Sequence, residues 1–178
     1  MQLQIESLSL DGRLRLTYKI TNVLGRPTYV QNLLGAPTSA RTYAYMHYIG
    51  GVAVLYCGTP MPPPMVSLGW PGRPPAQKLD AGGVLAGEIE RPLPLEEGTI
   101  GLRDDEQDFE DTSARRLCLI IEYQVEGIRG LKMKKYPDGT FDVWGVSPSR
   151  LQAWADLSKP LVVRRRKAEF ARVQPASG

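Results

Sequence analysis

The amino-acid sequence predicts one domain of mostly antiparallel β-structure, arranged as a β-sandwich. The chain has 18 glycines and 15 prolines among 178 residues, and these residue types favour turns over helix interiors. Residues 13–21 alternate between apolar and polar side chains, which is the pattern of a strand with one buried face. The length and the 42% apolar content fit an ordinary globular domain. We therefore assign residues 1–172 to this domain and residues 173–178 to a flexible tail.

The first two strands are predicted to pair as an antiparallel hairpin. Asp11-Gly12 supplies a two-residue turn between them, because glycine readily takes the positive φ that such turns require. The apolar phase of the first strand changes near Ser7, which indicates a bulge. In the second strand, the residues of the buried face are Leu14, Leu16, Tyr18 and Ile20.

The middle of the chain alternates between strands and loops. Residues 28–30 start a third strand, and residues 52–57 form an apolar run typical of a buried strand. Residues 35–51 fit either a ragged strand or a short helix, and both interpretations stay open. Residues 59–75 hold seven prolines, which cannot donate to a β-ladder, so this stretch is predicted to be loop or polyproline II.

The strands that follow are separated by an acidic loop. A turn at residues 79–83 leads into a strand over 84–91, and residues 92–95 read as an extended edge segment. Residues 117–121 are apolar at every position, which is typical of a central strand covered on both faces.

The C-terminal part is predicted to hold a hairpin, one short helix and a last strand. Residues 132–136 and 140–144 flank Pro137-Asp138-Gly139 and predict the hairpin. Ser147 is a plausible N-cap and Pro148 fits the first helical position. Apolar residues at helical spacing then extend the helix to about Asp156 and place Trp154 on the sandwich. The last strand runs from Leu161 to Arg165 or beyond.

Parts of the chain resemble a known family of sandwich domains. Tyr18-Lys19-Ile20-Thr21-Asn22 and Arg26-Pro27-Thr28-Tyr29-Val30 resemble the second and third strands of bacterial immunoglobulin-like or fibronectin-like domains, including intracellular proteinase-inhibitor-type ones. Residues 79–88 and 117–123 are similar to the turn-plus-strand and the central strand of such modules. The resemblance covers less than half of the chain. It implies an immunoglobulin-like sandwich and, as one alternative function, a peptidase inhibitor or regulator.

The charge distribution bears on possible partners. The net charge of +3 is too small to indicate a nucleic-acid partner by itself, but eight acids gather in residues 96–111 and six bases in residues 159–172. In the basic run, Arg164 and Arg166 would share one face of a strand and could contact phosphates. Such residues at a sheet edge also discourage aggregation. We favour that structural role and regard nucleic acid as an alternative partner only.

Catalysis and metal binding find little support in the sequence. His47 is the one histidine and could pair with Cys57 as base and nucleophile, but no known motif surrounds either residue. The acidic loop does not follow the EF-hand spacing, and we favour a solvated loop over a calcium site. Cys57 and Cys118 are expected to be free, buried thiols. We predict no enzyme activity, cofactor or metal, with an enzyme of unrecognised type as an alternative.

The proline-rich stretch is the predicted binding site. Pro60-x-x-Pro63 and Pro71-x-x-Pro74 have the spacing that polyproline-II receptors recognise. The alternative is a rigid loop that packs on its own domain with Trp70 as the plug. The leading hypothesis is a non-catalytic module that binds an unidentified protein through loops at one end of the sandwich. The candidate contact residues are Pro62, Pro63, Pro64, Met65 and Trp70.

The expected location is the cytoplasm. Residues 1–6 lack the basic and apolar regions of a signal peptide. The longest apolar runs have the length of a strand, well below the roughly 20 residues that span a bilayer, so no membrane insertion is expected. The sequence does not predict the oligomeric state.

Overall fold

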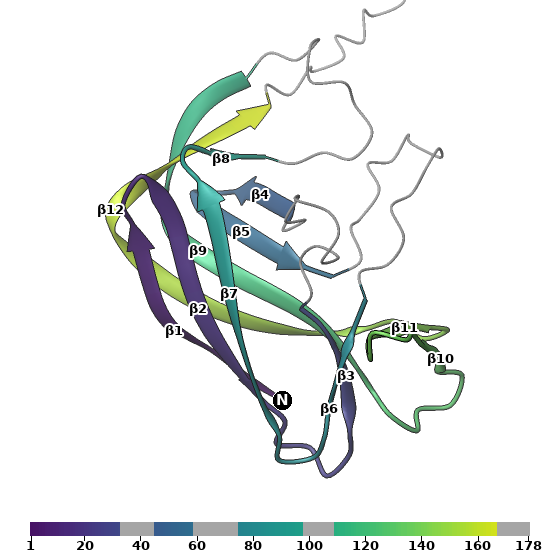
Figure 1. Cartoon of the computed structure of the whole chain (residues 1–178). Coiled ribbons are helices and arrows are strands. Elements are labelled where there is room, and N and C mark those ends of the chain that lie inside the picture. Colours follow the sequence, from purple (N-terminus) through teal and green to yellow (C-terminus); the bar gives the residue numbers. More distant parts are fainter. Residues whose placement is uncertain (33–44, 59–74, 98–108, 167–178) are drawn as a thin grey trace, which may run out of the picture.

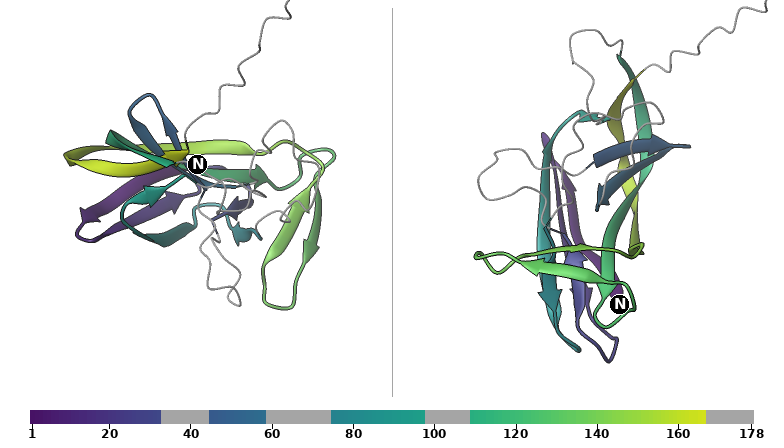
Figure 2. Two further views of the ribbon diagram at one scale, coloured as in Figure 1. Left: turned by 90° about the horizontal axis from the view of Figure 1, so that it is seen from above. Right: turned by 90° about the vertical axis from the view of Figure 1, so that its right-hand side faces the viewer.

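A computed structural model describes residues 1–32, 45–58, 75–97 and 109–166 of the chain. Two β-sheets pack face to face, and a separate two-stranded hairpin projects to one side of them (Figures 1 and 2). The residues in these four ranges form strands and turns but no helix, so they include no helix that could span a membrane. The mostly β, largely antiparallel fold that the sequence predicts is confirmed.

The smaller sheet has three antiparallel strands in the order β1-β2-β7. They are β1 (Gln2–Leu10), β2 (Arg13–Thr21) and β7 (Val84–Pro92). The predicted second strand is confirmed at both ends, and the register shift between Ile5 and Ser7 confirms the predicted bulge. Gly12 takes the expected positive φ of 65° in the turn between β1 and β2.

The larger sheet is built around two long strands. Its order is β4-β5-β9-β12-β8, and β3 and β6 extend it, because β3 pairs with both β9 and β6. The β5–β9 and β12–β8 pairs are parallel and the other pairs are antiparallel. The strands are β3 (Thr28–Gln31), β4 (Tyr45–Ile49), β5 (Val52–Cys57), β6 (Gln77–Leu79), β8 (Leu95–Glu96), β9 (Phe109–Val125) and β12 (Ser149–Arg166).

The predicted central strand is confirmed in this sheet, and part of the stretch that the sequence left open is strand. β9 contains the predicted central strand at residues 117–121 and has neighbours on both sides. Within the stretch that the sequence left open, residues 45–49 are strand and the remainder up to residue 44 lies outside the described ranges. Most of the proline-rich stretch, residues 59–74, and the predicted tail also lie outside them.

The predicted helix from Ser147 to Asp156 is wrong, because these residues lead into and begin strand β12. Residues 149–156 pair with residues 116–123 of β9 in antiparallel register. Their burial alternates with a period of two: Leu151 and Ala153 are buried, whereas Gln152 and Trp154 are exposed. The helical spacing of Leu151, Trp154 and Ala155 is therefore incidental, and long-range pairing with β9 overrides the local helix-start signal.

The main core lies between the two sheets. It joins Leu14, Leu16 and Ile20 of β2 to apolar side chains from the larger sheet, including Leu55 of β5 and Leu119 of β9. These residues occupy alternate positions on each strand, as expected for the faces that meet inside a two-layer structure.

Tyr18 fills the core beside a glycine. It is 1% exposed and pairs with Gly87 of β7. A Cβ atom on Gly87 would overlap the Tyr18 ring, so glycine leaves the space that the ring occupies. Burial, aided by the nearby Cys57, raises the pKa of the Tyr18 hydroxyl to about 12.

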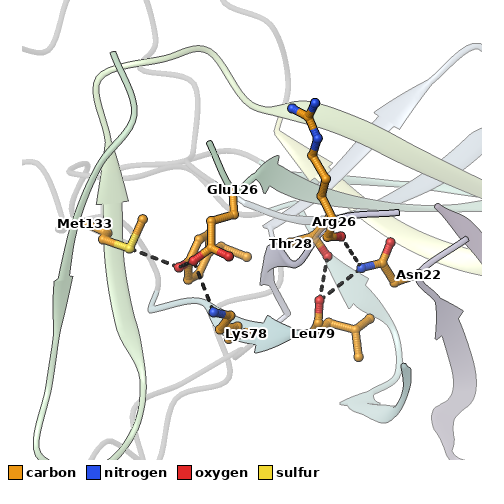
Figure 3. Close-up of polar contacts among 8 residues, drawn as sticks. Asn22, Arg26, Thr28, Lys78, Leu79, Glu126 and Met133 are labelled. Carbon is orange, nitrogen blue, oxygen red and sulfur yellow. Dashed lines mark hydrogen bonds and ion pairs between the residues drawn. The ribbon is translucent and has the colours of Figure 1, made fainter. Parts of the chain in front are cut away.

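Asn22 ties the turn after β2 to the turn before β7 (Figure 3). Its side chain is fully buried, and its Nδ2 donates to the carbonyl oxygens of Arg26, Leu79 and Asp80 at 2.8–3.0 Å. Its Oδ1 accepts from the backbone N–H of Leu24 at 3.0 Å. One amide thus holds together two chain segments that cross between the sheets.

Replacing Asn22 by alanine should lower the free energy of unfolding by about 2–4 kcal/mol, because the buried Leu79 carbonyl and the part-buried Arg26 and Asp80 carbonyls lose the amide that they share, and the Leu24 N–H loses its acceptor. Urea unfolding followed by circular dichroism measures this change. Gln152→Ala, which removes an exposed amide from β12, is the matched control and should change stability by less than about 0.5 kcal/mol. Equal stability of the two variants would contradict this role for Asn22.

The predicted hairpin is confirmed as β10 (Lys132–Lys135) paired with β11 (Phe141–Trp144). It packs on Tyr29 of β3 through Phe141, whose ring centroid lies 5.0 Å from that of Tyr29. The Tyr29 hydroxyl is 2.7 Å from Glu126 Oε1 and 2.9 Å from Met133 Sδ. Lys78 Nζ donates to the same Glu126 oxygen at 3.1 Å, so Glu126, Lys78 and Met133 surround the base of the hairpin (Figure 3).

Tyr29→Phe should loosen the hairpin without unfolding the sheets, since it keeps the ring contact and removes the hydroxyl that joins Glu126 to Met133. We expect amide hydrogen exchange in residues 132–144 to become about 5- to 30-fold faster, the equivalent of about 1–2 kcal/mol. Exchange in residues 117–121 should stay unchanged. Uniform acceleration across the chain would show that Tyr29 acts on global stability instead.

Candidate functional site

The predicted contact residues Pro62, Pro63, Pro64, Met65 and Trp70 lie outside the described ranges. The described residues therefore do not distinguish a binding loop from a loop packed on its own domain.

Of the predicted basic patch, Arg164 is compensated by acidic side chains. Arg164 Nε lies 3.2 Å from Asp111 Oδ1, and an Arg164 Nη1 lies 3.6 Å from Glu96 Oε1. The neighbouring Arg165 pairs with Glu110 at 2.8 Å. These pairs follow from the β9–β12 register, in which Asp111 lies opposite Arg164 and Glu110 opposite Arg165. Arg166 ends β12, and its side chain is not described.

His47 and Cys57 do not form a base–nucleophile pair. Cys57 belongs to the core between the sheets, and burial raises the pKa of its thiol well above the usual range. His47 lies opposite Val54 in the β4–β5 register. Residues 54 and 57 face opposite sides of β5 because side chains alternate along a strand. The imidazole and the thiol are thus on different faces of the sheet.

The two cysteines are free and buried, as expected. Cys118 lies opposite Val54 in the parallel β5–β9 register, so it faces the side of the sheet away from Cys57. Within the described ranges, no group of three or more His, Cys, Asp or Glu side chains could hold a metal ion. Residues 98–108 of the acidic loop lie outside those ranges.

The face of the larger sheet that points away from the main core carries rows of side chains across β4, β5, β9 and β12; we call it the outer face. One row is Ile49, Val52, Arg116 and Asp156, and the next is His47, Val54, Cys118 and Trp154, as the strand registers define them. Ile49 is 65% exposed and Trp154 is 49% exposed. Two large apolar side chains are therefore accessible at the two ends of these adjoining rows.

Trp154 is held in place by charged neighbours. The Arg116 guanidinium lies 4.8 Å from the centroid of the Trp154 ring, a cation–π distance. Arg116 Nε in turn pairs with Asp156 Oδ1 at 3.0 Å. The indole is thus stacked on a cation whose own position is set by an adjacent carboxylate. All three side chains are exposed, so the stacked pair lies at the surface of the sheet.

A buried polar cluster lies further along the same face, beyond the row of Tyr56, Ile120 and Gln152. Glu122 is 1% exposed, and its Oε1 accepts from the Tyr56 hydroxyl and from Arg150 Nε, the latter at 3.3 Å. A Cβ atom on Gly58 would lie 2.7 Å from this carboxylate, so the glycine provides its space. Burial and the hydrogen bond to Glu122 raise the pKa of the Tyr56 hydroxyl above its usual range.

Two buried glutamines lie beside Glu122. Gln31 is its cross-strand partner on β3, and Gln124 is two residues further along β9. Both are at least 96% buried, and neither Oε1 has a hydrogen-bond donor among the described residues. Gln124 Nε2 donates to the Val146 carbonyl at 2.8 Å. Glu122, Gln31 and Gln124 are thus buried polar residues, whereas Arg150 of the same cluster is exposed.

Sequence reasoning missed the outer face because it assigned Trp154 to a helix packed on the sandwich. The signal was present: Arg150, Gln152, Trp154 and Asp156 alternate with Leu151, Ala153 and Ala155, which is a strand period.

Comparison of the chain with protein-family models, with curated proteins and with solved structures finds no match.

Tyr56→Phe should lower the free energy of unfolding by about 1–3 kcal/mol, because it removes a donor from a buried carboxylate. Chemical unfolding measures the difference. Tyr136→Phe removes the hydroxyl of an exposed tyrosine and should be close to neutral. If both variants match the unmodified chain, the Glu122 cluster does not depend on the Tyr56 hydroxyl.

Proposed function

We infer that the chain is a non-catalytic module that binds another protein, and that the two apolar rows of the outer face are its contact surface. The observation that carries this proposal is the half-exposed Trp154 ring, stacked on Arg116 and fixed through Asp156.

The chemistry of this surface suits protein recognition. Tryptophan and arginine are enriched among the residues that contribute most to protein–protein binding. A ring that is already restrained loses little conformational freedom when a partner covers it. Ile49, at the β4 end of the adjoining row, is a second exposed apolar side chain on the same face, while Val54 and Cys118 between the two are buried. We therefore expect a partner with an apolar side chain for the Trp154 ring and polar groups for Arg116 and Asp156.

The proline-rich residues remain part of this proposal as a possible second contact. β5 supplies Val52 and Val54 to the outer face and ends at Cys57, so the stretch that holds Pro62 and Trp70 begins just after an outer-face strand.

We propose in addition that the sandwich is of the immunoglobulin-like type. Two of the segments that carry the resemblance lie in β2 and β3, which belong to different sheets. In immunoglobulin domains the second and third strands also belong to opposite sheets.

Substituting both Trp154 and Ile49 by serine should abolish or strongly weaken partner binding while leaving the fold intact. Loss of one central aromatic anchor of about 2 kcal/mol or more corresponds to roughly a 30-fold weaker Kd. The measurement is quantitative affinity capture from a lysate of the source cell, followed by titration of the captured protein with each variant.

The control is Val23→Ser with Val84→Ser, which removes two comparably exposed apolar side chains at one end of the smaller sheet. A third variant replaces Pro62, Pro63, Pro64 and Trp70. Binding that survives the outer-face variant but is lost in the proline-loop variant would move the contact surface to the loop. Absence of any stoichiometric partner of the unmodified chain would contradict the binding function.

A further inference from the structure

The β10–β11 hairpin concentrates uncompensated positive charge. Arg129, Lys132, Lys134 and Lys135 are all exposed, and none of them forms an ion pair within the described ranges, whereas Arg164 and Arg165 both do. Two acids lie in the same hairpin. Asp138 accepts hydrogen bonds from Thr140 in the turn, and Asp142 lies opposite Lys134 without a salt bridge to it.

Aromatic rings are interleaved with these cations. Side chains alternate along the hairpin, so Lys132 and Lys134 face away from the side on which Met133 and Phe141 meet Tyr29. Trp144 lies opposite Lys132 in the register and therefore shares its face. Tyr136 is 36% exposed, and Lys134 Nζ lies 5.5 Å from its ring centroid. One face of the ribbon thus presents lysines beside two aromatic rings.

The hairpin is a firm projection rather than a loose loop. It stands out from the packed sheets in both views of Figure 2. At its neck, Gly145 has a φ of 94°, and a Cβ there would overlap the Gly130 carbonyl oxygen. At its base, Glu126 and Met133 hold it to Tyr29.

We propose that this hairpin is a contact surface for nucleic acid. Phosphates are bound mainly by lysine and arginine side chains, and aromatic rings beside cations stack on bases. A two-stranded ribbon also has a width that the major groove of duplex DNA admits. From the sequence, nucleic acid is not the expected partner, because the net charge is small and the basic run at Arg164 is assigned a structural role. In the structure Arg164 forms ion pairs with acidic side chains. The hairpin cations form no ion pair within the described ranges. The proposal is independent of protein binding at the outer face.

The test is fluorescence anisotropy with three labelled probes of about 20 nucleotides: single-stranded DNA, single-stranded RNA and duplex DNA. Each is titrated between about 50 and 200 mM salt. Replacing Lys132 and Lys134, which share one face of the ribbon, by glutamine should weaken binding at least tenfold and reduce the salt slope by about 1.4–1.8, since each phosphate contact contributes roughly 0.7–0.9. Tyr136→Leu should weaken single-strand binding with the salt slope unchanged, because stacking releases no counterion.

The matched control replaces Arg115 and Lys159 by glutamine, two exposed cations on β9 and β12 that also form no ion pair within the described ranges, and should leave binding within about twofold. Circular dichroism verifies that each variant is folded. The proposal is overturned if no probe binds at the lowest salt, or if the control variant loses as much affinity as the hairpin variant. Equal or tighter binding to polyglutamate or to phosphatidylserine vesicles also overturns it in favour of an acidic protein or a membrane surface.

Discussion

The antiparallel pairing of β9 with β12 is the interaction on which the rest of the structure depends. The two strands span 17 and 18 residues and pair along almost their full length, with one irregularity between Asp156 and Leu161. β9 also pairs with β5 and β3, and β12 pairs with β8. β4 and β6 join through β5 and β3, so every strand of the larger sheet connects to this pair directly or through one neighbour.

Because side chains alternate along these two strands, their core residues and several of their charged residues lie on opposite faces. Leu117, Leu119 and Ile121 enter the core against the smaller sheet. Arg116, Cys118 and Glu122 face the opposite side together with Trp154 and Arg150 of β12. The same register places Asp111 opposite Arg164 and Glu110 opposite Arg165, so both of these arginines form ion pairs. Core, outer face and charge compensation all follow from one set of strand partners.

The sequence predicts features whose signals are local. The period-two pattern of residues 13–21 predicts β2, and Pro137-Asp138-Gly139 predicts the β10–β11 turn, because both signals lie within the elements themselves. The helix prediction at Ser147 fails for the complementary reason. Its N-cap signal is local, but the partner that makes residues 149–156 a strand is residues 116–123, which no local window contains.

The candidate surfaces also combine features that are visible in the sequence with features that depend on the fold. The hairpin lysines are visible in the sequence, but their lack of acidic partners requires the fold to be known. The exposure of Trp154 depends on which face of β12 meets the core. If the same residues formed a helix packed on the sandwich, Trp154 would be buried. Arg164 was singled out from the sequence, and only the strand register shows its pairing with Asp111.

Amide hydrogen exchange of the free chain, followed by NMR, tests the central role of the β9–β12 pair most directly. Residues 117–121 and 151–155 should exchange slowest and together, with the free energy of global unfolding, while residues 132–144 exchange through local opening. Exchange of residues 151–155 that is much faster than that of residues 117–121, or chemical shifts typical of a helix at these positions, would contradict the account.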